Sequence, residues 1–271
     1  MSALIDPALS PTEPILTVEN VYKRFGGINA VNGAGFGIAP GSVTALIGPN
    51  GAGKTSLFNV ISGFYRADRG NISYEGHSIA GRPPHVIARL GLVRTFQLPK
   101  ALTTMPVIDN MMLAAPRQPG EHLTTLLTRP MAARRREREV RARAIEVLAT
   151  FDLAGMADEY AGTLSGGQRK LLELARALMV EPSMVLLDEP MAGINPTLGR
   201  RLLDHMQALR RDRGLTFLFV EHDMEVVMNH SDRVIVMAQG RVIADGTPDE
   251  IRQNQQVIDA YLGDVPVEST E

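Results

Sequence analysis

Residues 48–56 read GPNGAGKTS, and this glycine-rich stretch decides the expected fold. It follows the apolar run Val43–Ile47 and precedes a segment with the apolar spacing of a helix. Glycine lets a backbone approach another group where a Cβ would collide with it. A strand, a glycine-rich loop and a helix in this order bring backbone N–H groups and a helix N-terminus together around an anion. The stretch therefore predicts a phosphate-binding loop.

The spacing within the stretch is that of a P-loop: Gly48, four further residues, then Gly53, Lys54 and Thr55. In such a loop Lys54 reaches the β and γ phosphates of a nucleotide, and the Thr55 hydroxyl binds Mg²⁺. A glycine-rich turn with a chance lysine is the alternative, but the flanking strand and helix patterns argue against it. The expected nucleotide-binding residues are Gly48, Asn50, Gly51, Ala52, Gly53, Lys54, Thr55 and Ser56.

The composition excludes several classes of site. Lysine and arginine number 28 against 30 acidic residues in 271, so the net charge of −2 gives no indication of nucleic-acid binding. The absence of cysteine excludes a disulfide framework, a thiolate zinc site and a cysteine nucleophile. No apolar run comes near the ~20 residues that cross a bilayer. We therefore expect a soluble, cytoplasmic chain with a flexible leader over residues 1–14.

Several patterns predict an α/β organisation around the loop. Residues 15–47 alternate in short apolar runs, which is typical of antiparallel strands. The apolar runs at 184–190 and 216–222 flank a helical stretch at 196–212, as in parallel strands joined by a crossover helix. Residues 234–246 then predict a hairpin.

Local signals mark the ends of the last elements. The hairpin should turn near Gln239 and Gly240. A helix should follow, with Thr247 as its N-cap, Pro248 at the first helical position and Glu250 completing a capping box.

A mostly helical subdomain is expected between about residues 94 and 178. Its clearest helix carries Val140, Ile145 and Leu148 on one face.

The same helix contains an arginine-rich run at residues 134–143. Glu137 and Glu139 interrupt the run and can pair with Arg141 and Arg143 at helical spacing. A solvated helix face is therefore favoured over a nucleic-acid site, and contact with lipid headgroups is a weaker alternative.

A second motif, LSGGQ at residues 164–168, resembles the signature of ATP-binding cassette (ABC) proteins. Ser165 can cap the helix that follows, and Gln168 can close a capping box. Gly166 and Gly167 would leave backbone donors open, which predicts another anion-binding helix start. Because the chain has one P-loop, this second start is explained if two such domains sandwich each nucleotide.

Other residues match the motifs of the same family. The resemblance implies that Asp188, in LLDEP, holds Mg²⁺ and that Glu189 is the general base for the attacking water. It also implies that His222, in VEHDM, contacts the γ-phosphate and that Gln97 senses Mg²⁺ and the attacking water. Phe25 occupies the place of the aromatic residue that stacks on adenine, although a core aromatic is the alternative there.

The resemblance covers residues 16–262 and implies the P-loop NTPase fold of an ABC cassette, with an antiparallel β subdomain and the inserted helical subdomain. The expected cassette domain is 15–263, followed by a tail at 264–271. Asn195 in MAGINP, together with VEHDMEVVM and VIDAYLG, resembles the branched-chain or hydrophobic amino-acid importer branch. That branch often carries a bulkier residue within the signature than the plain LSGGQ here.

The resemblance implies an ATP- and Mg²⁺-dependent hydrolase at the cytoplasmic face of the inner membrane. Its expected partners are a second cassette, identical or paralogous, two transmembrane permeases and, indirectly, an extracytoplasmic solute-binding protein, but no nucleic acid. A cassette for urea, another small solute or lipopolysaccharide export is the alternative in cargo. A soluble cassette ATPase would carry a long coiled coil, cysteine-rich zinc modules or a second cassette, and a metabolic P-loop kinase would lack LSGGQ.

Overall fold

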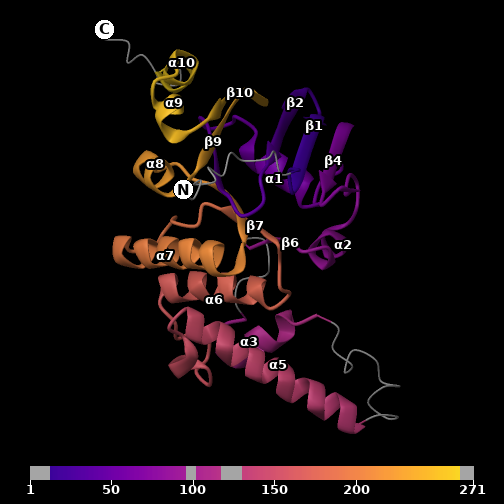
Figure 1. The fold of residues 1–271 in the computed structure, drawn as a ribbon, viewed down its shortest axis with the longest axis vertical. Coiled ribbons are helices and arrows are strands. Elements are labelled where there is room, and N and C mark those ends of the chain that lie inside the picture. The colour runs from indigo at the N-terminus through magenta and orange to yellow at the C-terminus, as the bar shows by residue number, and fades with distance from the viewer. Residues whose placement is uncertain (1–12, 96–101, 117–129, 263–271) are drawn as a thin grey trace, which may run out of the picture.

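The computed structural model describes residues 13–95, 102–116 and 130–262, which build two sheets and the helices around them (Figure 1). The strands are β1 (Leu16–Phe25), β2 (Ile28–Ile38), β3 (Val43–Ile47), β4 (Arg69–Tyr74), β5 (His77–Ser78), β6 (Leu92–Arg94), β7 (Met184–Asp188), β8 (Thr216–Val220), β9 (Arg233–Ala238) and β10 (Arg241–Gly246). The helices are α1 (Lys54–Ile61), α2 (Pro84–Arg89), α3 (Val107–Ala114), α5 (Pro130–Thr150), the 3-10 turn η2 (Ala154–Met156), α6 (Gly166–Leu178), α7 (Pro196–Arg213), α8 (Met224–His230), α9 (Pro248–Arg252) and α10 (Gln255–Leu262).

The larger sheet has the strand order β10-β9-β3-β8-β7-β6. Strands β6, β7, β8, β3 and β9 run parallel, and β10 closes the edge as the antiparallel half of a hairpin. Every residue of β3 and β8 is buried, which explains why both read as continuous apolar runs and not as alternating ones. The predicted parallel strands are therefore confirmed.

The smaller sheet is antiparallel, in the order β2-β1-β4-β5, as the alternation in residues 15–47 predicts. Helix α1 lies between the two sheets, because Leu57 and Phe58 share one apolar cluster with Ile72 of the smaller sheet and Leu46 of the larger. The helix that follows the P-loop is thus held on two sides.

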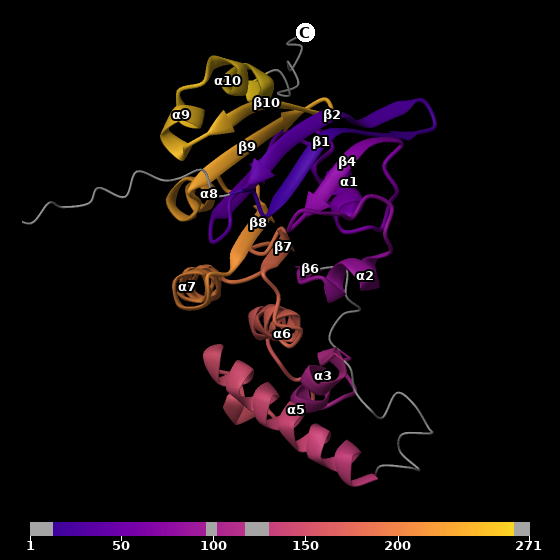
Figure 2. The same ribbon diagram turned by 45° about the vertical axis from the view of Figure 1, so that its right-hand side comes forward.

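The helical subdomain lies at one end of the molecule, where α6 packs against α7 on one side and against α3 and α5 on the other (Figures 1 and 2). The buried face of α5 consists of Val140, Ala144, Val147 and Leu148, and Phe151 directly after the helix is buried with them. The prediction for Val140 and Leu148 is confirmed, but that for Ile145 is wrong, since its side chain is 42% exposed. Ile145 lies one residue, or about 100° around the helix, beyond Ala144, and the packing of α3 and α6 selects the face centred on the alanine.

The arginine-rich run is an exposed face of α5, as expected, but its ion pairs differ from those predicted. Glu139 pairs with Arg135 at 2.9 Å, one turn earlier in the helix. Arg141 contacts Asp158 at 3.3 Å, and Arg143 contacts a glutamate three residues further along. Helical spacing allows a glutamate to pair with an arginine one turn earlier or one turn later. Asp158, the partner of Arg141, lies in the segment after α5, and no local pattern in the helix reveals it.

Several predicted helix and hairpin ends are confirmed. Ser165 with Gln168, and Thr247 with Glu250, form reciprocal capping boxes. The chain turns between β9 and β10 at Gln239 and Gly240, both with positive φ. The predicted leader lies largely outside the described residues and the predicted tail entirely so, and the proposed domain limits stay predictions.

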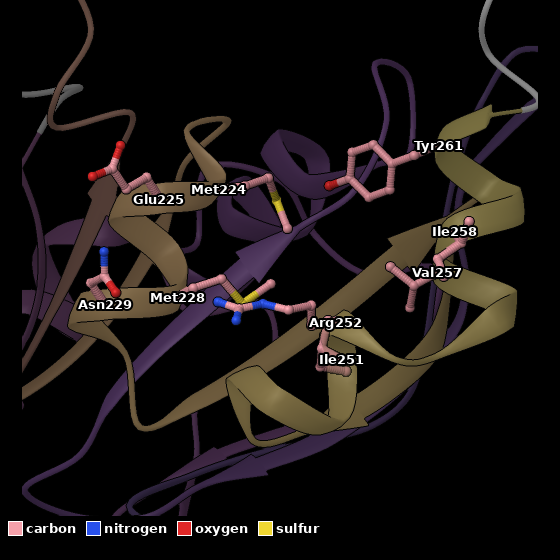
Figure 3. Close-up of a pocket in the computed structure, with 9 residues that line it drawn as sticks. All are labelled: Met224, Glu225, Met228, Asn229, Ile251, Arg252, Val257, Ile258 and Tyr261. Carbon is pink, nitrogen blue, oxygen red and sulfur yellow. The ribbon is translucent and has the colours of Figure 1, made fainter.

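The C-terminal helices α8, α9 and α10 surround an apolar cavity of about 540 Å³ (Figure 3). Met224 and Met228 line it from α8, and Val257 and Ile258 from α10. Burial raises the pKa of Tyr261, at the edge of this cavity, while a backbone hydrogen bond with Gly48 opposes that shift. The last described helix therefore contacts the first glycine of the P-loop. Among the described residues, no helix has the length and apolarity needed to cross a membrane.

Two neighbouring residues of α5 test the assignment of its buried face. Leu148→Ala should lower the free energy of unfolding by about 2–5 kcal/mol, because Leu148 is fully buried and its truncation leaves a cavity. Ile145→Ala is the matched control and should change it by less than about 0.5 kcal/mol. Chemical denaturation of both variants measures the difference, and equal losses would contradict the assigned face.

Candidate functional site

The predicted P-loop, acidic pair and histidine follow three adjacent parallel strands. The P-loop leaves β3, His222 follows β8, and β7 ends at Asp188, with Glu189 directly after it. Carboxyl ends of parallel strands lie along one edge of a sheet, which is where ligands bind in α/β folds. The strand order β3-β8-β7 thus brings together groups that are up to 174 residues apart in the sequence.

The P-loop adopts a conformation that only glycine fits. Gly48 and Gly53 have φ values of 144° and 97°, and a Cβ on Gly53 would collide with the carbonyl oxygen of Ala30. The loop curls around the side chain of Lys54, whose Nζ donates hydrogen bonds to the carbonyl oxygens of Gly48 at 2.7 Å and Pro49 at 2.9 Å. The lysine is therefore held across the mouth of the loop.

The N-terminus of α1 offers donors that the protein itself does not use. Within the described residues, the backbone N–H groups of Gly53, Lys54, Thr55 and Ser56 donate no hydrogen bond. Helix α1 also has no side-chain cap and no acidic residue in its first turn. Unused N–H groups at a helix N-terminus, where the helix dipole favours negative charge, are suited to bind a phosphate group.

The charge of Lys54 is stabilised by the acidic pair. Lys54 is only 6% exposed, and burial lowers its pKa, while the negative charges of Glu189 and Asp188 oppose the shift. A buried cation needs compensating negative charge. The loop, the lysine and the free N–H groups together fit the phosphates of a nucleotide.

Glu189 and His222 form a direct contact at the open edge of the sheet. The Nε2 atom of His222 lies 2.8 Å from the Oε1 atom of Glu189, and both side chains are about half exposed, at 47% and 45%. Glu189 has a positive φ of 49°, and Lys170 on α6 donates hydrogen bonds to its carbonyl oxygen at 3.1 Å and to that of Pro190 at 3.3 Å. The carboxylate of Glu189 is therefore accessible to water, while its backbone carbonyl is held by Lys170.

Asp188 pairs with a residue that the sequence interpretation missed. Its Oδ2 atom accepts a hydrogen bond from Nη2 of Arg94 at 2.6 Å. The described residues contain no group of three or more histidine, aspartate or glutamate side chains that could hold a metal on their own. Asp188 and Thr55 carry oxygen atoms of the kind that Mg²⁺ binds, and this ion commonly takes its remaining ligands from phosphate and water. The metal site itself stays a prediction.

Glu221 is a second residue that the sequence interpretation missed. It is 5% exposed, and its carboxylate accepts hydrogen bonds from the backbone N–H of Met191 at 2.7 Å and of His222 at 3.2 Å. Burial raises its pKa, and these two bonds partly oppose the shift. Glu221 thus connects the loop after Glu189 to the histidine. The available signal was an acidic residue at the end of an otherwise apolar strand, where a charge needs partners.

Two further predicted residues have different outcomes. Phe25 is 41% exposed, and its ring meets that of Tyr65 edge-on with 5.1 Å between the ring centres, so the alternative of a core aromatic is wrong. Its stacking on adenine stays a prediction. Gln97 lies outside the described residues, and its role stays a prediction as well.

The helix that begins at the signature, α6, lies well away from α1, the helix that follows the P-loop (Figures 1 and 2). No hydrogen bond or ion pair between described residues joins 165–168 to 48–56. Gly166 is exposed, but Gly167 is buried, and a Cβ there would collide with Leu198 of α7. The second glycine is therefore also required for helix packing, a reason that the sequence interpretation did not include.

Comparisons with known proteins agree with this geometry. The family model described as ABC transporter matches residues 31–192, and the one described as branched-chain amino acid ATP-binding cassette transporter matches residues 241–266. The chain is similar to the probable branched-chain amino acid transport ATP-binding protein LivG of Archaeoglobus fulgidus, with 42% identity over 92% of this chain and 95% of the relative.

It is also similar to the high-affinity branched-chain amino acid transport ATP-binding protein BraF of Pseudomonas aeruginosa, with 43% identity over 93% of this chain and 99% of the relative. Among solved structures, the ADP conformation of an ATP-binding cassette of an ABC transporter matches with a TM-score of 0.78 and 35% identity. That match covers 93% of this chain and 100% of the other.

The close approach of the P-loop backbone yields a prediction. Gly53→Ala should abolish nucleotide binding and lower the melting temperature, because the added Cβ collides with a backbone carbonyl that cannot turn aside. Gly27→Ala is the matched control, since a Cβ at that glycine meets nothing within 4 Å. Binding of a fluorescent ATP analogue and thermal unfolding measure both effects. Normal nucleotide binding by Gly53→Ala would contradict the role of the loop.

Proposed function

The chain belongs to the ABC transporter family, and from that premise we propose that it is the ATP-hydrolysing subunit of an importer for branched-chain or other hydrophobic amino acids. The observation that best supports hydrolysis is the meeting of Lys54, Glu189 and His222 at the ends of adjacent strands. A lysine that binds phosphate beside an accessible carboxylate supplies both parts that water attack on a phosphoryl group needs.

Each residue has a distinct task in this proposal. Lys54 and the free N–H groups of α1 bind the β and γ phosphates. Thr55 and Asp188 would hold Mg²⁺, which when bound neutralises phosphate charge. Glu189 accepts a proton from the attacking water. His222, which lies against Glu189 at the neighbouring strand end, contacts the γ-phosphate.

The separation of the signature from the P-loop supports a dimer. Ser165, Gly166, Gly167 and Gln168 lie at the start of α6 and form no hydrogen bond with the P-loop among the described residues, so we assign them to the nucleotide of a second cassette. Two cassettes in head-to-tail arrangement then enclose two ATP molecules. Because ATP favours the closed pair, binding closes it and hydrolysis lets it reopen. The second cassette is either an identical or a paralogous chain.

The remaining partners follow from coupling to transport. We propose that the cassette pair binds two transmembrane permeases at the cytoplasmic face of the inner membrane, and that a solute-binding protein outside the membrane acts on it indirectly. The names of the relatives and the match over residues 241–266 support amino-acid cargo. Urea, another small solute or lipopolysaccharide export would keep the same ATPase and change only the cargo.

The proposed general base is tested by Glu189→Gln. The amide cannot accept the proton from water, so turnover should fall about 100-fold or more, while ATP affinity stays near that of the unchanged protein. Phosphate release and equilibrium binding of ATP measure the two quantities separately. Near-normal hydrolysis in this variant would remove Glu189 from its role.

The cargo is tested by uptake in cells. Deletion of the gene, in a strain without a redundant importer, should abolish ATP-dependent uptake of leucine, isoleucine or valine, and the Glu189→Gln chain should fail to restore it. Loss of urea uptake or an outer-membrane lipid defect would support the alternative cargoes. Unchanged uptake of every amino acid tested would refute the cargo without affecting the ATPase assignment.

A further inference from the structure

Arg94 is an arginine buried at the end of β6, beside two aromatic rings. Its side chain is only 2% exposed. The guanidinium carbon lies 5.7 Å from the ring centre of Phe58 and 5.9 Å from that of Phe64. Arginine is rarely buried to this extent unless its charge is paired.

The guanidinium group of Arg94 joins two elements of the nucleotide site. Its Nη2 donates to Oδ2 of Asp188 at 2.6 Å, at the end of β7. Its Nη1 donates to Oδ1 of Asn59 at 2.7 Å and to Oγ of Ser62 at 3.3 Å. Asn59 lies in α1, the helix that begins at the P-loop, and Ser62 is its C-cap. One rigid group therefore connects the P-loop helix to the carboxylate assigned to the metal.

Stability alone does not account for this arrangement. Removing two charges from water is costly, and well-packed apolar side chains often replace a buried ion pair without loss of stability. The Nε atom of Arg94 is also buried with no hydrogen-bond partner among the described residues, which adds to the cost. The contact is better explained by the geometry that it imposes on Asp188.

We propose that Arg94 is a positioning residue for Mg²⁺, which fixes one oxygen of Asp188 and leaves the other oxygen to serve the metal. This inference rests on the proposed function, since Asp188 has a metal to serve only if the chain binds Mg-ATP. Hydrogen bonds to a metal-binding carboxylate orient it, and their loss commonly weakens metal affinity or activity about 10- to 100-fold.

The chemistry of arginine explains why no other cation would serve here. Its planar fork donates from two nitrogens in fixed directions, so it reaches Asp188 and Asn59 at once. A lysine at residue 94 would keep the positive charge but present a single nitrogen. Arg94→Lys should therefore retain only part of the effect.

The experiment measures metal dependence without turnover. Each variant is made in the Glu189→Gln chain, and affinity for a fluorescent ATP analogue is measured in EDTA and across a Mg²⁺ titration. Arg94→Met, which keeps a long side chain without charge, should raise the Mg²⁺ concentration at half-effect about 10-fold or more. Its affinity in EDTA should stay within about twofold, and Arg94→Lys should lie between. Binding of Mn²⁺, followed by electron paramagnetic resonance, gives a direct reading of the metal.

Two further variants keep the test decisive. Arg176→Met removes another buried arginine, 6% exposed on α6, and should leave the Mg²⁺ midpoint unchanged even if it lowers the melting temperature. Asn59→Ala removes the shorter of the two bonds from Arg94 to α1 and its C-cap but keeps the pair with Asp188, so it should shift the midpoint in the same direction by a smaller factor. If Arg94→Met fails to fold, the Mg²⁺ midpoint of Asn59→Ala tests the proposal in its place.

The outcomes separate this inference from the proposed function. An unchanged Mg²⁺ midpoint in Arg94→Met, or in Asn59→Ala where Arg94→Met does not fold, would overturn the positioning role. A lower midpoint would also overturn it, because it would show that Arg94 acts only as a charge that repels the cation. If the Glu189→Gln chain itself binds the analogue no better with Mg²⁺ than without, the proposed function fails, whatever Arg94 does.

Discussion

The pairing of β3, β8 and β7 is the constraint on which the site depends. These strands are parallel and adjacent, with Leu46 beside Val220 and Asp188 beside Val220 in register. A shift of one residue in any strand would turn its side chains to the other face of the sheet and move the group at its end by about 3.3 Å. The distance of 2.8 Å between His222 and Glu189 is therefore a result of how three buried apolar strands align. The catalytic geometry is determined by the core.

Electrostatic balance in this site is shared among several strands and helices. The negative charges of Asp188 and Glu189 act on Lys54. Asp188 also forms an ion pair with Arg94. The carboxylate of Glu221 accepts hydrogen bonds from backbone N–H groups. Each buried charge thus has a partner from a different element of the fold. Such an arrangement allows charged groups to be buried in a largely apolar setting. The removal of one group then leaves its partner buried without compensation.

The parts of the site that the sequence predicts are those with local signals. The P-loop, the capping box of α6 and the ends of β7 and β8 are each encoded within a few residues, so a single stretch suffices to place them. Arg94 could not be predicted, because its three polar partners are 32 to 94 residues away. The exposed position of Ile145 and the packing role of Gly167 likewise depend on which helix lies opposite, and helical periodicity does not contain that information.

Lys170 connects the signature helix to the backbone of the proposed general base, which bears on the order in which two ATP molecules would be hydrolysed. It lies in α6, the helix that begins at the signature, and it binds the carbonyl oxygens of Glu189 and Pro190. Under the proposed dimer, the signature end of α6 serves one nucleotide and Glu189 serves the other. A displacement of α6 when one nucleotide leaves is then transmitted to the backbone beneath the base of the opposite site. The Lys170 amino group would thus couple hydrolysis at one site to the presence of nucleotide at the other.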